Sequence, residues 1–167
     1  DLSCMNEQRG TMVVSLDLEL CWGRFDKVPV SALEADAEEE RIQIKRLLSL
    51  LDQYEIPATW AMVGHLMLPG CSREPGGAHA DVMPRPAYSW FPKDWYVHDP
   101  CTSAGHAPGW YAPDILDWIR GMKVRHEIAS HSFAHIYYGD PECSVAAARA
   151  DLSAAMAAAA EQSVSLK

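Results

Sequence analysis

Segments with a strand pattern alternate with segments of helical period along this chain, and this order limits the fold more than any other feature. Residues 11–18 (TMVVSLDL) are β-branched and apolar, which indicates a buried strand. Two more strands are expected, from Pro57 to Gly64 and within RHEIAS at 125–130. Helices are expected at about 33–54, from Pro113 to Met122, and at 142–162. Such alternation builds a parallel sheet with crossover helices, so we expect an α/β fold.

Length and charge narrow the class of protein. A chain of 167 residues can form one domain with a substantial core, so we expect residues 1–167 to form a single domain. The formal net charge of −9 argues against a nucleic-acid surface, which needs clustered Lys and Arg. No apolar run approaches the roughly 18 residues that span a bilayer, so no membrane span is expected. The five cysteines are odd in number and include no CxxC pair, which indicates a reducing, cytoplasmic location.

A segment without sustained period lies at about 69–110 and is rich in Pro, Gly and aromatic residues. Loops of this length are usually functional or disordered, so we interpret it as a long excursion or lid. Its aromatic run YSWFPKDWY suggests stacking platforms for the rings of a ligand or, equally, a plug over the mouth of the fold. The candidates for substrate binding are Trp90, Trp95 and Trp110. The histidines on or beside the excursion show no ligand spacing and are expected to be solvated: His65, His79, His98 and His106.

Two pairs of potential metal ligands follow the ends of two expected strands. In SLDLELCWG, Asp17 and Glu19 are two residues apart, so both side chains leave an extended chain on the same face. In HEIASHSFAH, His131 and His135 are four residues apart, which is a little more than one helical turn. Because parallel strands carry their sites at their carboxyl ends, we expect the two pairs to converge.

Two imidazoles and one carboxylate are a common ligand set for catalytic Zn²⁺ and leave a coordination position open for water. The remaining carboxylate could then take the proton from that water. Each pair alone also has an ordinary explanation, since histidines at helix starts serve as caps and acids after strands form turns. A divalent metal, with Zn²⁺ as the first candidate, is the expected cofactor. His126 is expected to be structural.

Three segments in order, VVSLDLELCWG, ATWAMVG and HEIASHSFAH, resemble motifs of the polysaccharide deacetylases, carbohydrate esterase family four. The resemblance covers most of the chain outside the excursion, and the histidine motif is its most specific part. It implies a distorted (β/α) barrel and metal-dependent removal of N-acetyl, or occasionally O-acetyl, groups from a polysaccharide or glycan precursor. It also implies that Asp17 is the catalytic base and that the metal ligands are Glu19, His131 and His135.

Two departures from the family pattern bear on these roles. The family's second acid is usually Asp and often follows the first directly, whereas here Leu18 intervenes and the ligand is Glu19. If Glu19 did not reach the metal, Asp17 would bind it instead. The family also continues with an Arg-Pro motif, a further acid and a late histidine that acts as general acid. We therefore expect an incomplete barrel, truncated at the C-terminus, in which SVSLK begins a fourth strand.

In the implied reaction, the cation lowers the pKa of its water and polarises the acetamide carbonyl while Asp17 removes the proton. A backbone N–H near the two histidines is expected to help to hold the oxyanion. The partner that the resemblance implies is a carbohydrate substrate, whose sugar rings could stack on the aromatic run of the excursion. Two rival functions remain open: a cyclic amide or imide (allantoin-like) hydrolase of the same fold, and a non-catalytic glycan-binding module.

Overall fold

A three-stranded parallel sheet organises the chain, of which the computed structural model describes residues 10–167. The strands are β1 (Ser15–Leu18), β2 (Thr59–Met62) and β5 (Glu127–Ser130), and their order in the sheet is β1-β2-β5. Each strand lies within a segment expected from the sequence, and the mixed α/β class with crossover helices is confirmed. Within residues 10–167 the sheet stays open and forms no closed barrel.

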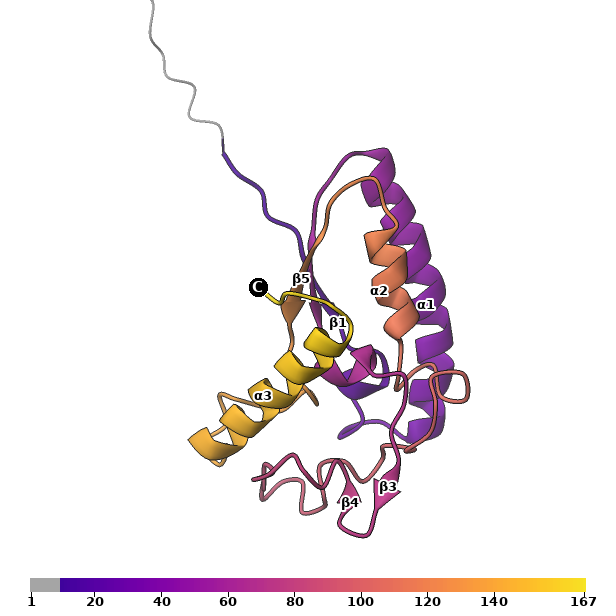
Figure 1. The fold of residues 1–167 in the computed structure, drawn as a ribbon. Coiled ribbons are helices and arrows are strands. Elements are labelled where there is room, and N and C mark those ends of the chain that lie inside the picture. Colours follow the sequence, from indigo (N-terminus) through magenta and orange to yellow (C-terminus); the bar gives the residue numbers. More distant parts are fainter. Residues whose placement is uncertain (1–9) are drawn as a thin grey trace, which may run out of the picture.

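Two helices lie in the crossovers and run side by side along the sheet (Figure 1). α1 (Val30–Gln53) connects β1 to β2, and α2 (Pro113–Arg120) precedes β5. α1 buries a stripe of apolar side chains at helical spacing, formed by Leu33, Ala37, Ile44, Leu48 and Leu51. α2 begins with Pro113, whose fixed φ and missing N–H suit the first helical position. The helical spacing of apolar residues therefore predicts both helices, because burial of one apolar face is also what stabilises them.

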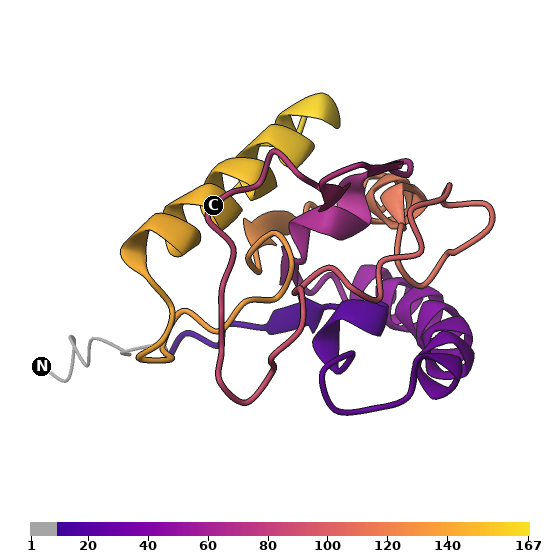
Figure 2. The ribbon, with the colours of Figure 1, turned by 90° about the horizontal axis from the view of Figure 1, so that it is seen from below.

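The third helix, α3 (Val145–Glu161), lies apart from α1 and α2 in both ribbon views (Figure 1, Figure 2). Ser144 caps it, because the N–H of Ala147 donates to the Ser144 hydroxyl over 3.0 Å. The helix packs on η2 (Gly64–Met67), the single turn that follows β2. A Cβ on Gly64 would lie only 2.9 Å from the Cα of Ala155, so small residues set the close approach of α3 to η2.

The excursion at 69–110 forms a packed layer at the carboxyl ends of the strands (Figure 1). Figure 2 views the molecule from this side. Its regular structure is one short antiparallel pair, β3 (Arg73–Glu74) and β4 (Gly77–Ala78). Most of its aromatic side chains are buried and meet those that follow β1, with ring centroids 4.9 Å apart for Phe25 and Trp95 and 5.3 Å for Trp22 and Trp110. This packing matches a plug and not an open lid.

The end of the chain returns to the sheet. The N–H of Lys167 donates to the carbonyl of Ile128 in β5 over 3.2 Å, so SVSLK approaches the edge where a fourth strand was expected. In the part of the chain described, however, no strand forms there.

No helix among residues 10–167 is long and apolar enough to cross a membrane.

Candidate metal centre

Glu19, His131 and His135 converge at the carboxyl ends of β1 and β5 and are called the Glu19 site below. The Oε1 atom of Glu19 lies 2.9 Å from Nε2 of His131 and 3.1 Å from Nε2 of His135. The three side chains are between 19% and 27% exposed, so the site is sheltered but reachable. One carboxylate oxygen and two imidazole nitrogens that face each other are a donor set that suits Zn²⁺ and leaves room for water or substrate.

The backbone after β1 places Glu19 in this cluster. The strand ends at Leu18, and η1 (Leu20–Gly23) begins directly after Glu19. Gly23 lies against the Glu19 side chain, where a Cβ would collide with Oε2. A glycine at position 23 is therefore what allows the carboxylate to occupy its place between the two histidines.

The Glu19 site is electrostatically coupled. Hydrogen bonds with His131 and His135 hold the pKa of Glu19 far below its ordinary value, so this carboxylate stays ionised. The hydrogen bond with Glu19 raises the pKa of His131 above its ordinary value. Protons therefore compete with a cation for His131 when the pH falls.

The stability of the metal-free protein should depend on pH through this pair. Because the folded pKa of His131 is raised, its contribution is complete below its unfolded value of 6.5 and is lost as the pH rises through the folded pKa. The pKa of Glu19 is depressed, so its contribution is present above about 4.5 and is lost only in stronger acid. With EDTA present to remove metal, we expect His131→Gln to lower the Tm by about 2–4 °C between about pH 4.5 and pH 6.5. Thermal unfolding should show a smaller difference at alkaline pH, and a difference that widens there would contradict the pairing.

The two histidines are joined by a tight turn (131–135, called the histidine turn) and not by the helical turn that their spacing suggested. Ser132 and His135 have positive φ values of 63° and 55°, which are unusual for residues other than glycine. Such backbone persists only where its surroundings enforce it, and it is often found at functional sites. The N–H groups of Gly64 and His65 in η2 hold the turn by donating to the carbonyls of Ser132 and Phe133, each over 2.8 Å.

A buried carboxylate in α3 also holds the histidine turn. Asp151 accepts hydrogen bonds from the N–H groups of Phe133 at 2.7 Å and Ala134 at 3.1 Å, and from the hydroxyl of Tyr138 at 2.6 Å. These two N–H groups are thus occupied and are not available to an oxyanion. Sequence reasoning missed Asp151, and the available signal was a lone acid on the buried face of an alanine-rich helix.

Asp151→Ala should weaken both the fold and the Glu19 site. The change leaves two buried N–H groups and one hydroxyl without their acceptor, at about 1–3 kcal/mol for each unsatisfied group. We expect the free energy of unfolding to fall by about 2–4 kcal/mol and zinc affinity to fall with it, because the spacing of the imidazoles is no longer fixed. Asp151→Asn keeps one acceptor oxygen and should lose less. Urea unfolding and competitive zinc titration measure both effects, and wild-type values for Asp151→Ala would show that the turn supports itself.

Asp17 lies beside the Glu19 site but outside its group of convergent donors. Its side chain is 60% exposed, and Oδ1 lies 3.8 Å from Nδ1 of His131, the ring nitrogen not directed to Glu19. This distance is longer than a hydrogen bond. Glu19, not Asp17, therefore makes the close contacts with both histidines, and the Asp17 carboxylate is free for another role.

Two of the three tryptophans expected to bind substrate are buried in the core. Trp95 and Trp110 are each 1% exposed, so neither offers a ring face to a ligand, and the expectation for them is corrected. Trp95 instead donates its indole N–H to the carbonyl of Ala134 over 2.7 Å, which adds a third support for the histidine turn. Apolar aromatic runs predict burial and stacking equally well, and here burial prevails.

Trp90 differs from the other two because it is 46% exposed. One face stacks on Tyr88, with centroids 4.9 Å apart, and its edge contacts with Tyr137 place it 5.2 Å from that ring. Tyr137 in turn lies 5.9 Å from the ring of His135. Trp90 is thus an accessible aromatic ring two contacts away from the Glu19 site.

His65 and His79 are not solvated loop residues, which corrects a second expectation. The side chain of His65 is fully buried and that of His79 is 10% exposed, and each lies 3.0 Å from Oδ2 of Asp99. With Cys71 they form another group of potential metal ligands, called the Asp99 site below. The irregular spacing of these residues along 65–99 gave no motif to recognise.

The remaining histidines behave as expected. His106 is exposed and bonds to Ser103, and His98 is partly exposed. His126 accepts a hydrogen bond from the backbone N–H of Ala58 over 3.2 Å, which is a structural role between β5 and the start of β2.

A groove of about 570 Å³ lies between β1 and α1 and reaches the Glu19 site. Its apolar lining includes Leu16 and Ile44, and its carboxylates include Asp17 and Glu19. The groove could admit an uncharged or cationic chain more readily than an anionic one.

Comparison with protein-family models, with curated proteins and with solved structures found no match to this chain. Its function therefore rests on the geometry of the site.

Proposed function

We propose that this protein is a metal-dependent hydrolase of the polysaccharide deacetylase type, which removes N-acetyl or O-acetyl groups from a polysaccharide or glycan precursor. The observation that carries the proposal is the convergence of Glu19 on both histidines, at 2.9 and 3.1 Å, from segments more than a hundred residues apart. A helical cap or a surface turn would not require this meeting. A hydrolytic metal centre does.

The chain supplies three ligands and an adjacent carboxylate. Glu19, His131 and His135 would hold the cation, which would lower the pKa of a bound water and polarise the acetyl carbonyl. Asp17 takes the proton from the attacking water, because its carboxylate is free of close partners and adjoins the site. Asp151 positions the two imidazoles through the backbone of the histidine turn.

The surroundings of the site support a carbohydrate substrate. The groove between β1 and α1 has a volume of about 570 Å³, which gives room for sugar residues beside Glu19 and Asp17. Trp90 presents an exposed indole of the kind on which sugar rings stack. The carboxylates in the groove also suit a glycan whose acetamides become cationic amines after reaction.

Acetate release by the zinc-loaded protein tests this function. We expect zinc-dependent acetate from at least one member of a panel of N-acetylglucosamine oligomers and O-acetylated polysaccharides, with metal content measured on the same sample. Ring opening of cyclic amides without acetate release would replace the proposal with the imide hydrolase. Glycan binding without turnover by fully loaded protein would replace it with a binding module.

A further inference from the structure

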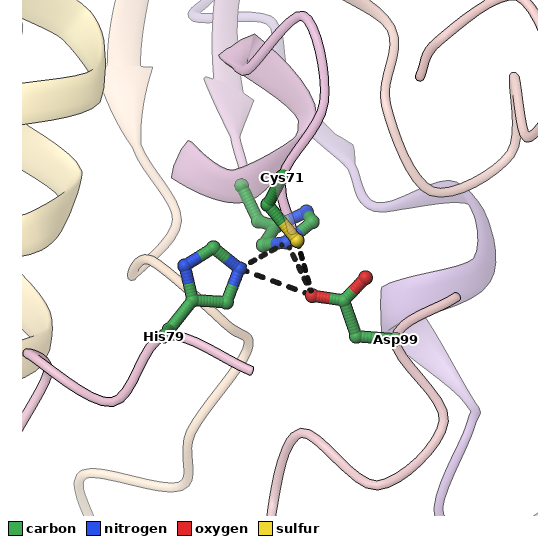
Figure 3. A group of neighbouring side chains, drawn as sticks. Cys71, His79 and Asp99 are labelled. Carbon is green, nitrogen blue, oxygen red and sulfur yellow. Dashed lines mark hydrogen bonds and ion pairs between the residues drawn. The ribbon is translucent and has the colours of Figure 1, made fainter. Parts of the chain in front are cut away.

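A second set of potential ligands is buried between η2 and the excursion, away from the Glu19 site. It comprises His65 of η2 and three residues of the excursion, Cys71, His79 and Asp99. Figure 3 shows the Cys71 sulfur, the His79 ring and the Asp99 carboxylate directed at a common region. The Nε2 atoms of His65 and His79 lie 2.8 Å apart, and each is 3.0 Å from Oδ2 of Asp99. The sulfur of Cys71 is 3.5 Å from the same oxygen.

The outer contacts of these residues fix which atoms face inward. Nδ1 of His65 lies 3.1 Å from the carbonyl of Trp110, which can only accept, so this nitrogen carries the proton and Nε2 of a neutral ring carries a lone pair. The other carboxylate oxygen of Asp99 accepts the N–H of Cys101 at 2.9 Å and the hydroxyl of Tyr111. Asp99 therefore presents Oδ2 inward. Metal ligands commonly have such outer hydrogen bonds, which orient the ring and the carboxylate.

Protons alone satisfy this arrangement poorly. With His65 neutral, its Nε2 lone pair faces the carboxylate oxygen at 3.0 Å, and two acceptors repel at this distance. A single Nε2–H on His79 can point to one of these acceptors at a time. The alternative is a charged imidazolium on the fully buried His65. A cation among the four side chains removes the repulsion and needs no buried imidazolium.

The spacing of the donor atoms is close to that around zinc. Zn–S and Zn–O bonds of about 2.3 and 2.0 Å at a tetrahedral angle separate sulfur and oxygen by about 3.5 Å, the distance found for Cys71 and Asp99. The corresponding N–N and N–O separations are about 3.3 Å, so the two Nε2 atoms and Oδ2 of Asp99 need to move apart from one another by about 0.3–0.5 Å. Two nitrogens, one sulfur and one oxygen also favour Zn²⁺ over Mg²⁺ or Ca²⁺, which prefer oxygen ligands.

We propose that His65, Cys71, His79 and Asp99 form a closed structural zinc site that fastens the excursion to the carboxyl ends of the strands. Four protein ligands leave no coordination position for substrate, in contrast to the three at the Glu19 site. The excursion has little secondary structure of its own, so a cross-link between residues 65 and 99 would hold it in place. His65 also donates its backbone N–H to Phe133, so the same cross-link steadies the histidine turn.

Metal analysis in a background without the Glu19 site tests this proposal independently of any deacetylase activity. The variant His131→Ala/His135→Ala should retain one zinc per chain after gel filtration. Adding Cys71→Ser or His79→Ala should remove that zinc, whereas Cys143→Ser is the matched cysteine control and should keep it. EDTA should lower the Tm of the histidine double variant by roughly 10 °C or more, because binding free energy at a structural site is folding free energy.

Cobalt provides a readout that separates the two sites. Only the Asp99 site contains a thiolate, so the Co²⁺-loaded protein should show a sulfur-to-cobalt charge-transfer band with the strong visible absorption of tetrahedral cobalt. The band should persist in the histidine double variant and disappear with Cys71→Ser. If Cys71→Ser is less stable, its spectrum is recorded at low temperature, where the variant stays folded. A double variant that is folded, free of zinc and without this band would overturn the proposal.

Discussion

His131→Ala/His135→Ala should abolish acetate release and remove one zinc per chain. Two of the three ligands at the Glu19 site are lost, and Glu19 alone cannot hold a divalent cation at micromolar concentration. We expect kcat/KM to fall by at least about 10³-fold, to the background of the assay. Mass spectrometric metal analysis and acetate release on the same preparation measure both quantities.

The design distinguishes loss of chemistry from loss of fold. His106→Ala is the control, because His106 is an exposed histidine that contacts neither site. The double variant should keep its second zinc and its far-ultraviolet circular dichroism, so total metal should fall from about two to about one per chain. Full acetate release by the double variant would disprove a catalytic role for the Glu19 site, whatever its metal content.

Asp17→Asn should remove turnover while zinc remains bound. Asparagine matches aspartate in shape but cannot take a proton, and general base catalysis contributes about 10²–10⁴-fold to rate. We expect kcat to fall by this factor with unchanged zinc stoichiometry and nearly unchanged KM, measured by steady-state kinetics on the best glycan of the panel. Asp36→Asn is the control, since Asp36 is an exposed acid paired with Arg24 on the surface.

The position of Asp17 beside Nδ1 of His131 gives this variant a second possible outcome. A carboxylate that only orients a ligating histidine typically changes metal affinity or activity by about 10–100-fold when removed. Weaker zinc binding, together with activity restored by added zinc, would therefore assign Asp17 to positioning and would contradict its role as the base.

The sequence predicts the elements of this fold well because burial produces them. Ile44, Leu48 and Leu51 repeat at helical spacing and are buried in α1, and the strand patterns coincide with β1, β2 and β5. The meeting of Glu19 with the two histidines was also foreseeable, since parallel strands bring their carboxyl ends to one edge. The features that depend on the direction of strands and helices could thus be derived from the pattern of apolar residues in the sequence.

The supports of the site could not be derived in the same way. Asp151 and the Asp99 site depend on contacts between irregular segments, where neither a period of two nor one of 3.6 relates position to direction. Trp95 illustrates the same limit, because its amphipathic ring suits both a sugar platform and a core, and only its tertiary neighbours select the core. The resemblance to a known family also named no residue in these supports.

The close packing of α3 on η2 implies that small, unreactive residues help to set the geometry of the Glu19 site. Gly64 and Ala155 nearly touch, and Asp151 lies one helical turn from Ala155 on the same helix. A bulkier residue at either position would push α3 away from η2. The Asp151 carboxylate would then move away from the N–H groups of Phe133 and Ala134. The separation of the two imidazoles therefore depends on the absence of a side chain at Gly64, on the other side of the histidine turn.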